Sequence, residues 1–240
     1  MTKQRISFWS SPRNISTALM YSFAQREDMA VVDEPLYAHY LRRQPTSAEH
    51  PGKATILASQ ENDGNLVIKE MLEGNFGKPK VLFKQMTHHL VALDEGFLDE
   101  MDNVLLIRNP RAILASFSKV VDGVTAEDIG LPQQLRLFRT LSEKGKAPAV
   151  VDARLLLQDP KAVLQRLCQF LNLSWTDKML TWQAGPRPED GVWAPYWYAN
   201  VHKSTGFLPY REKHYDLPPA LETIAAACQP IYASLLEAAI

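Results

Sequence analysis

The chain has 240 residues, of which 46% are hydrophobic, and its formal net charge is −1. A balance this close to neutral argues against a nucleic-acid surface or a polybasic membrane anchor, so any cationic site must be local. The length accommodates a single α/β domain over residues 1–240.

The cysteines and the distribution of apolar residues indicate the cellular compartment of the protein. Cys168 and Cys228 fall on apolar helical faces and are interpreted as buried thiols rather than as a disulfide or a metal site. The first residues enter a strand pattern without an apolar signal core, and no later segment approaches the roughly 18 uncharged residues of a membrane span. The sequence therefore predicts a soluble, cytoplasmic protein with no membrane segment.

The stretch from Ile6 to Thr17 predicts a strand, a loop and the start of a helix. A short apolar run ends in the loop, and apolar residues then recur at helical spacing from Leu19 to Phe23. The helix is expected to begin near residue 14 and to run to about Glu27.

The start of this helix is a candidate anion site. A helix N-terminus presents free backbone N–H groups and the positive end of the helix dipole, and the guanidinium of Arg13 and several hydroxyl groups would converge there on a phosphate or a sulfate. The candidate residues are Ser11, Pro12, Arg13, Asn14, Ile15, Ser16 and Thr17. The loop lacks the glycines and lysine of an ATP-binding P-loop, which disfavours an ordinary NTPase.

Two later strands are predicted to end at the same edge of the sheet. Residues 29–33 form a buried strand pattern followed by Glu34, and residues 80–84 end at Lys84 and are followed by His88 and His89. The carboxyl ends of parallel strands form the ligand edge, so these four side chains are candidate site residues. The structural alternatives are a helix cap at Glu34 and surface histidines. A metal site is disfavoured because the adjacent histidines have no third ligand nearby.

The clearest strand pattern, residues 103–107, leads through Arg108 into a helix whose first position suits Pro110. Ser116 follows two turns later, and a fork-shaped cation together with a hydroxyl group suits a phosphate monoester. The alternative is a helix start with surface arginines.

The remaining chain is predicted to contain four helical segments, one short strand and two irregular segments. The helices are expected over residues 53–74 with a break at Gly64, over 131–143, from 160 onward after the cap Asp159, and over 219–239; the strand covers 149–152. Residues 37–51 are interpreted as a loop or irregular helix. The aromatic segment 175–198 either lines an acceptor pocket or only anchors itself to the core.

A polar turn follows the aromatic segment. Its residues Lys203, Ser204, Thr205 and Gly206 suit a loop that wraps phosphate and adenine.

The anion loop, the run from Arg108 to Arg111 with Ser116, and the helix after Asp159 resemble, in this order, a family of sulfotransferases. The family uses 3′-phosphoadenosine 5′-phosphosulfate (PAPS), and the resemblance is to its bacterial branch. It implies a three-layer α/β sandwich with a central parallel sheet, similar to P-loop nucleotide hydrolases. It also implies metal-independent transfer of a sulfuryl group from PAPS to a hydroxyl or amine group of a small-molecule acceptor.

The resemblance assigns roles to the candidate residues. Arg13 stands where cytosolic sulfotransferases carry a lysine, and it is expected to clamp the leaving phosphate, with Lys84 as a second cation. The general base is Glu34, placed ahead of His88 and His89. A tyrosine of the family's nucleotide site is missing near Ala153. The alternatives are an ATP-dependent phosphoryl transferase on the same type of sheet and a nucleotide-binding protein without catalysis.

Overall fold

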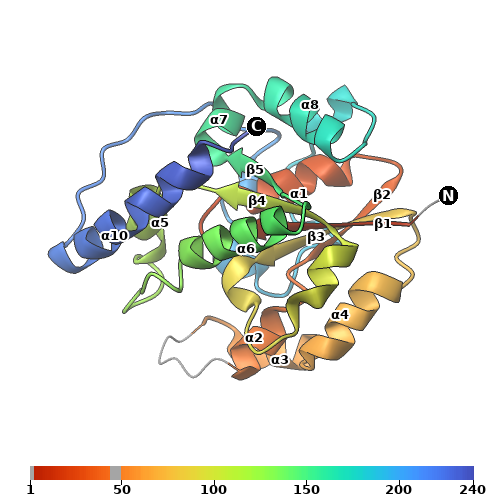
Figure 1. The fold of residues 1–240 in the computed structure, drawn as a ribbon, viewed down its shortest axis with the longest axis horizontal. Coiled ribbons are helices and arrows are strands. Elements are labelled where there is room, and N and C mark those ends of the chain that lie inside the picture. Colours follow the sequence, from red (N-terminus) through yellow and green to blue (C-terminus); the bar gives the residue numbers. More distant parts are fainter. Residues whose placement is uncertain (1–2, 44–49) are drawn as a thin grey trace.

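The computed structural model describes residues 3–43 and 50–240 and is built around a five-stranded parallel sheet (Figure 1). The strand order is β2-β3-β1-β4-β5, and every neighbouring pair is parallel. The strands are β1 (Gln4–Ser10), β2 (Met29–Asp33), β3 (Lys80–Met86), β4 (Asp102–Ile107) and β5 (Ala149–Asp152). The predicted α/β class and all five predicted strands are confirmed.

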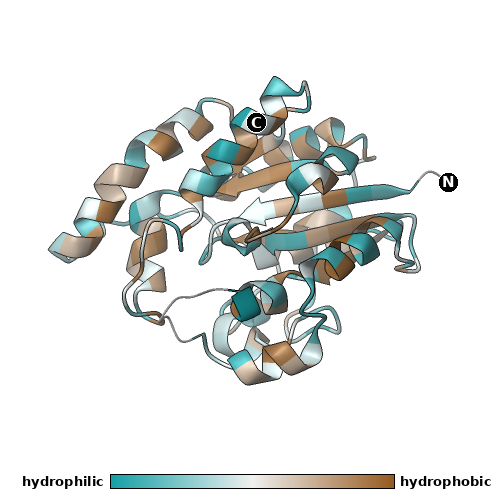
Figure 2. Cartoon of the chain, turned by 60° about the horizontal axis from the view of Figure 1, so that its bottom comes forward, coloured by the Kyte–Doolittle hydropathy of each residue, from teal (hydrophilic) through white to brown (hydrophobic). Residues whose placement is uncertain are grey.

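Helices cover both faces of the sheet. Successive side chains of a strand point to opposite faces, so Phe8 and Trp9 enter different cores. The core around Phe8 includes α1 (Ser16–Ala24), α7 (Ala153–Gln158) and α8 (Pro160–Phe170). The core around Trp9 includes α4 (Gly64–Glu73), α5 (Pro110–Phe117), α6 (Leu131–Glu143) and α10 (Pro219–Leu236). Figure 2 shows brown apolar stretches in the central strands and helices that mix teal and brown.

Several helix boundaries differ from the sequence predictions. Helix α1 ends at Ala24, before the expected Glu27, and α10 ends at Leu236 rather than at Ala239. The break predicted at Gly64 does separate two helices, α3 (Lys53–Ser59) and α4, and α4 begins at Gly64 because the side chain of Asp63 caps it.

Two short helices were not predicted as such. Helix α2 (Tyr37–Arg43) is regular where a loop or irregular helix was expected, and residues 44–49 of that segment lie outside the described part. Helix α7 begins directly after β5 because the carboxylate of Asp152 accepts from the backbone of Arg154 at 3.0 Å and of Leu155 at 3.1 Å. Short 3-10 segments also lie in the described chain: η1 (Thr87–His89), η2 (Glu95–Glu100), η3 (Asp177–Leu180) and η4 (Val201–Lys203), besides the short helix α9 (Ala194–Trp197).

The register brings the carboxyl ends of the strands together. Ser10 of β1 lies opposite Met86 of β3 and Leu106 of β4, and Asp33 of β2 lies opposite Lys84. The loops that follow each strand therefore share one edge, where ligands bind in open parallel sheets.

Both cysteines are free and buried, which confirms the prediction for them. Among the described residues, no helix combines the length and the apolar composition needed to cross a bilayer.

Candidate active site

The loop between β1 and α1 leaves the first turn of α1 open. No side chain in the described part of the chain caps this helix at Ile15, so the backbone N–H groups of Ser16 and Thr17 have no capping partner there. Asn14 fixes the loop, since its side chain donates to the carbonyl of Leu106 at 3.0 Å and accepts from the N–H of Ile15 at 2.8 Å. The open helix end and its dipole suit an anion.

Two arginines meet beside this loop. Arg108 donates to the carbonyl oxygen of Arg13, a residue whose φ of 54° lies in the left-handed region. Nε of Arg13 donates to Oγ of Ser116 at 3.0 Å, and its guanidinium lies 5.8 Å from the ring centroid of Trp197. Burial, and then the charge of Arg108, lower the pKa of Arg13 from its ordinary value. Ser116, predicted to act together with Arg108, is the acceptor of this hydrogen bond from Arg13.

A cavity of about 1430 Å³ opens at this edge of the sheet. It is large enough for a nucleotide and a second small molecule, since drug-sized ligands occupy cavities of about 300 to 1,000 Å³. Most of the predicted site residues line it: Pro12, Arg13, Asn14, Ile15, Ser16, Thr17, Glu34, Lys84, His88, His89, Arg108, Ser116, Ser204 and Gly206.

Three predicted residues do not line the cavity. The hydroxyl of Ser11 is buried and donates to Oε1 of Gln134 at 3.4 Å, and Lys203 and Thr205 are exposed. The neighbouring Ser204 reaches the cavity, but its hydroxyl donates to the carbonyl of Val201 at 2.7 Å. The polar turn thus contributes two of its four predicted residues to the cavity lining.

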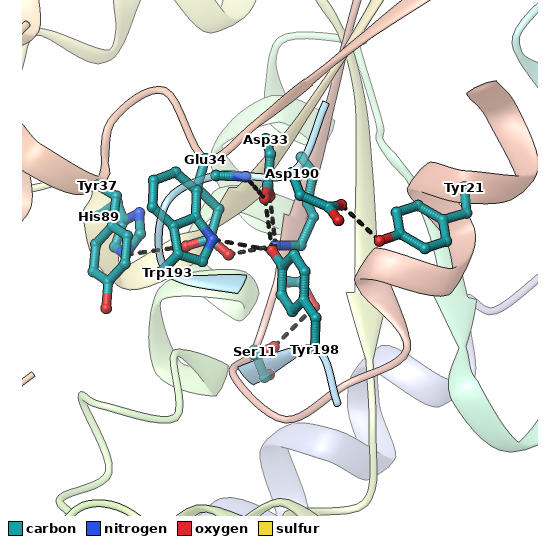
Figure 3. Close-up of polar contacts among 12 residues, drawn as sticks. Ser11, Tyr21, Asp33, Glu34, Tyr37, His89, Asp190, Trp193 and Tyr198 are labelled. Atoms are coloured by element: carbon teal, nitrogen blue, oxygen red, sulfur yellow. Dashed lines mark hydrogen bonds and ion pairs between the residues drawn. The ribbon is translucent and has the colours of Figure 1, made fainter. Parts of the chain in front are cut away.

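A buried polar cluster closes the floor of the cavity (Figure 3). Nζ of Lys84 donates to Glu34, to Oδ1 of Asp33 at 2.8 Å and to the hydroxyl of Tyr198 at 2.8 Å. The Tyr198 hydroxyl donates to Oδ2 of Asp33 at 2.7 Å and accepts from Nε1 of Trp193 at 3.0 Å. Two strands and the aromatic segment before η4 therefore converge on one ammonium group.

Glu34 is the carboxylate of this cluster that lines the cavity. Desolvation raises its pKa to about 7, the charge of Lys84 lowers it and the charge of Asp33 raises it. A carboxyl group with a pKa near neutrality can gain and release a proton at physiological pH, which general acid–base catalysis requires. Its φ of 40° places its backbone in a conformation that few L-residues adopt.

The histidines form an aromatic wall next to Glu34. The ring of His89 stacks on Tyr37 with centroids 4.9 Å apart and on Tyr40 at 4.8 Å, and it meets His88 edge-on at 4.7 Å. Burial lowers the pKa of His88 to about 3 and that of His89 well below its ordinary value. Both imidazoles are therefore neutral at physiological pH. Nε2 of His89 lies 4.0 Å from Oε2 of Glu34.

Sequence reasoning missed two parts of the site. The sequence predicts Asp33 only as the last residue of a strand, although an Asp-Glu pair at a strand end is a visible signal for a site. The exposed basic run Arg211, Lys213 and His214 also lines the cavity. These basic residues follow shortly after the turn that was predicted to wrap the nucleotide, and that position could have indicated that they line the site. Among the described residues, no group of three or more His, Cys, Asp or Glu side chains is placed to hold a metal ion.

Comparison with known proteins identifies relatives along almost the whole chain. The family described as "Sulfotransferase domain" matches residues 4–237. A curated protein of Arabidopsis thaliana, "Branched-chain-amino-acid aminotransferase-like protein 2", is 41% identical over 229 residues, which are 95% of this chain and 40% of that protein. The chain thus spans about two fifths of the length of the curated relatives it matches.

Solved structures share the fold at low identity. The "Sulfotransferase Domain from the Curacin Biosynthetic Pathway" matches with a TM-score of 0.54 and 16% identity, covering 95% of this chain and 98% of that one. A sulfotransferase from Alicyclobacillus acidocaldarius matches with a TM-score of 0.55 and 13% identity, covering 98% and 95%. These matches confirm the predicted three-layer, P-loop-like α/β sandwich.

Proposed function

Because this chain belongs to the sulfotransferase domain family, we propose that it transfers the sulfuryl group of PAPS to a hydroxyl or amine group of a small-molecule acceptor. The observation that carries the proposal is the shared cavity: the open turn of α1, the two arginines and Glu34 all line it. An anion-binding end and a carboxyl group that titrates near neutrality are the two parts that such a transfer needs.

Different residues would hold the two charged ends of the donor, PAPS. Arg13 and the N–H groups of Ser16 and Thr17 would hold the 5′-phosphosulfate, while Arg108 and Ser116 would hold the 3′-phosphate. Charge-assisted hydrogen bonds of this kind each contribute about 1.5 to 3 kcal/mol.

In the transfer step, Glu34 takes the proton of the acceptor while the acceptor oxygen or nitrogen attacks sulfur. The bond between sulfur and the bridging oxygen breaks, and adenosine 3′,5′-bisphosphate leaves with the added negative charge on its 5′-phosphate. Arg13 stabilises that charge. His88 and His89 are the second choice for the base, because a pKa of about 3 or well below the ordinary value makes a neutral imidazole a weak proton acceptor.

The test measures transfer of labelled sulfate from PAPS to a panel of phenols, alcohols and amines. Loss of one donor to a developing negative charge lowers kcat about 10²- to 10³-fold, which is the expectation for Arg13→Ala. Loss of a general base lowers it about 10²- to 10⁴-fold, which is the expectation for Glu34→Gln. Arg139→Ala removes an exposed arginine of α6 that does not line the cavity and is expected to leave the rate unchanged.

Two results would contradict the proposal. Magnesium-dependent turnover of ATP without turnover of PAPS would indicate a phosphoryl transferase. Tight binding of adenosine 3′,5′-bisphosphate without transfer to any acceptor would indicate a nucleotide-binding protein that does not catalyse.

A further inference from the structure

We propose that Asp33, which does not line the cavity, is a positioning residue that holds the ammonium of Lys84 so that Glu34 is presented to the cavity as a proton acceptor. The inference rests on the proposed function, in which Glu34 is the base. Asp33 and Lys84 lie directly opposite each other in the parallel register of β2 and β3, so their side chains share a face of the sheet.

Lys84 has no N–H group left for a substrate in this arrangement. An ammonium group has three donors, and Asp33, Glu34 and Tyr198 accept all three. The side chain is only 1% exposed. Lys84 therefore acts on Glu34 rather than as a second cation on the leaving phosphate.

Asp33 is itself fully occupied. Its Oδ1 accepts from Lys84, and its Oδ2 accepts from the hydroxyl of Tyr198 at 2.7 Å and from the N–H of Gly191 at 3.0 Å. These partners come from β3 and from the aromatic segment, so the carboxylate is locked in place behind Glu34. Figure 3 shows Asp33 and Glu34 in the same network of polar contacts as Tyr198 and Trp193.

The charge count explains why the second carboxylate matters. One ammonium group shared by two carboxylates leaves a net charge of −1, and a like charge nearby disfavours ionisation of a carboxyl group. Lys84 alone lowers the pKa of Glu34 and so makes it a weaker proton acceptor. Desolvation is the largest cause of the raised pKa of Glu34, and the charge of Asp33 raises it further by offsetting part of the effect of Lys84.

The groups that face Glu34 come from every element around it. Lys84 approaches from β3, Asp33 from β2, His89 from η1, Tyr37 from α2 and Tyr198 from the aromatic segment. The imidazole and the two phenols are neutral at physiological pH, because burial lowers the pKa of His89 and raises the pKa values of Tyr37 and Tyr198. Asp33 and Lys84 are thus the two charged side chains that act on the pKa of Glu34, in addition to its burial.

The competing explanation is that Asp33 only fastens the aromatic segment to β2 through Gly191 and Tyr198. NMR titration of protein labelled with ¹³C at the glutamate carboxyl carbon separates the two explanations, with the Glu34 signal assigned by its loss in Glu34→Gln. In Asp33→Asn we expect the pKa of Glu34 to fall by about 1 to 3 pH units, the size of a shift from one close charge. An unchanged pKa would overturn the proposal.

A matched control variant loosens the aromatic segment but leaves the charges of Asp33 and Lys84 in place. Tyr21 donates to Oδ1 of Asp190 at 2.6 Å, and Asp190 also contacts His202 at 2.9 Å. Tyr21→Phe is therefore expected to lower stability and to leave the pKa of Glu34 in place. If the pKa falls as far in Tyr21→Phe as in Asp33→Asn, the positioning role is wrong.

A second variant keeps the proposal testable if Asp33→Asn does not fold. Lys84→Met removes the bridge between the carboxylates, and the pKa of Glu34 is then expected to rise above its wild-type value by at least about 1 pH unit. No rise would overturn the proposal. The titration involves no PAPS, so a failure of sulfuryl transfer and a failure of the positioning role give different results.

Discussion

Arg13 and Arg108 bring two positive charges near each other, after the ends of β1 and β4. The guanidinium of Arg108 donates to the carbonyl of Arg13, and its charge contributes to the lowered pKa of that residue. Two cations held together at a cavity are stabilised when an anion binds between or beside them. The pair therefore argues for a ligand with more than one negative group.

This pair predicts a preference for a doubly phosphorylated nucleotide. Adenosine 3′,5′-bisphosphate should bind about 10- to 150-fold more tightly than AMP, because one charge-assisted hydrogen bond is worth about 1.5 to 3 kcal/mol. Isothermal calorimetry measures both affinities. In Arg108→Ala the two nucleotides should bind with similar affinity, whereas the exposed-residue variant Arg139→Ala should keep the difference. Equal affinities in the wild-type protein would refute the role of Arg108.

At the scale of elements, helix α4 shows how a close contact overrides helix propensity. Its first residue, Gly64, donates its N–H to Nδ1 of His39 at 3.1 Å, and a Cβ at this position would lie 2.5 Å from Leu93 and 2.8 Å from the imidazole. His39 in turn contacts the carbonyl of Val91 at 2.8 Å. The glycine is thus required by the packing of α2 against α4.

Gly64→Ala is accordingly expected to destabilise the protein, although alanine is the better helix former. Overpacking of this kind costs about 1 to 3 kcal/mol, against a gain of roughly 1 kcal/mol in helix propensity. Urea unfolding measures the net change in the free energy of unfolding. The matched variant Asn65→Ala, at an exposed position of the same helix, should be neutral or slightly stabilising. A more stable Gly64→Ala protein would show that the contact with His39 is not tight.

The elements also show what the sequence could and could not predict. Strand patterns and their following polar residues predicted that Arg13, Glu34 and Arg108 share one edge, because parallel strands all end on the same side. The hydrogen bond from Tyr198 to Asp33 joins residues 165 positions apart. It depends on how an irregular segment folds back over β2, and such a segment has no periodicity to reveal its path. Of the three partners of Lys84, only Tyr198 comes from this segment, and that contact could not be predicted for the same reason.

At the scale of the whole molecule, buried titrating groups couple stability to pH. His88 and His89 stay neutral in the folded protein, because burial lowers the pKa of one to about 3 and that of the other well below its ordinary value. Unfolded histidines take up protons below about pH 6.5. Glu34 acts in the opposite direction, since its pKa of about 7 makes the folded protein hold a proton that the unfolded chain releases above about pH 4.3.

Between pH 5 and 6 the two histidines and the one glutamate leave the unfolded chain with one more bound proton than the folded protein. The free energy of unfolding should therefore fall by roughly 1 kcal/mol for each pH unit by which the solution is acidified. His50, whose pKa burial also lowers, adds to the fall. Urea unfolding at pH 7, 6 and 5 measures the slope. His88→Gln should make the slope shallower by about one proton and Glu34→Gln steeper by about one proton. An unchanged slope in Glu34→Gln would show that Glu34 is ionised in the folded state, because a carboxyl group that is ionised in both states binds no proton in either over this pH range.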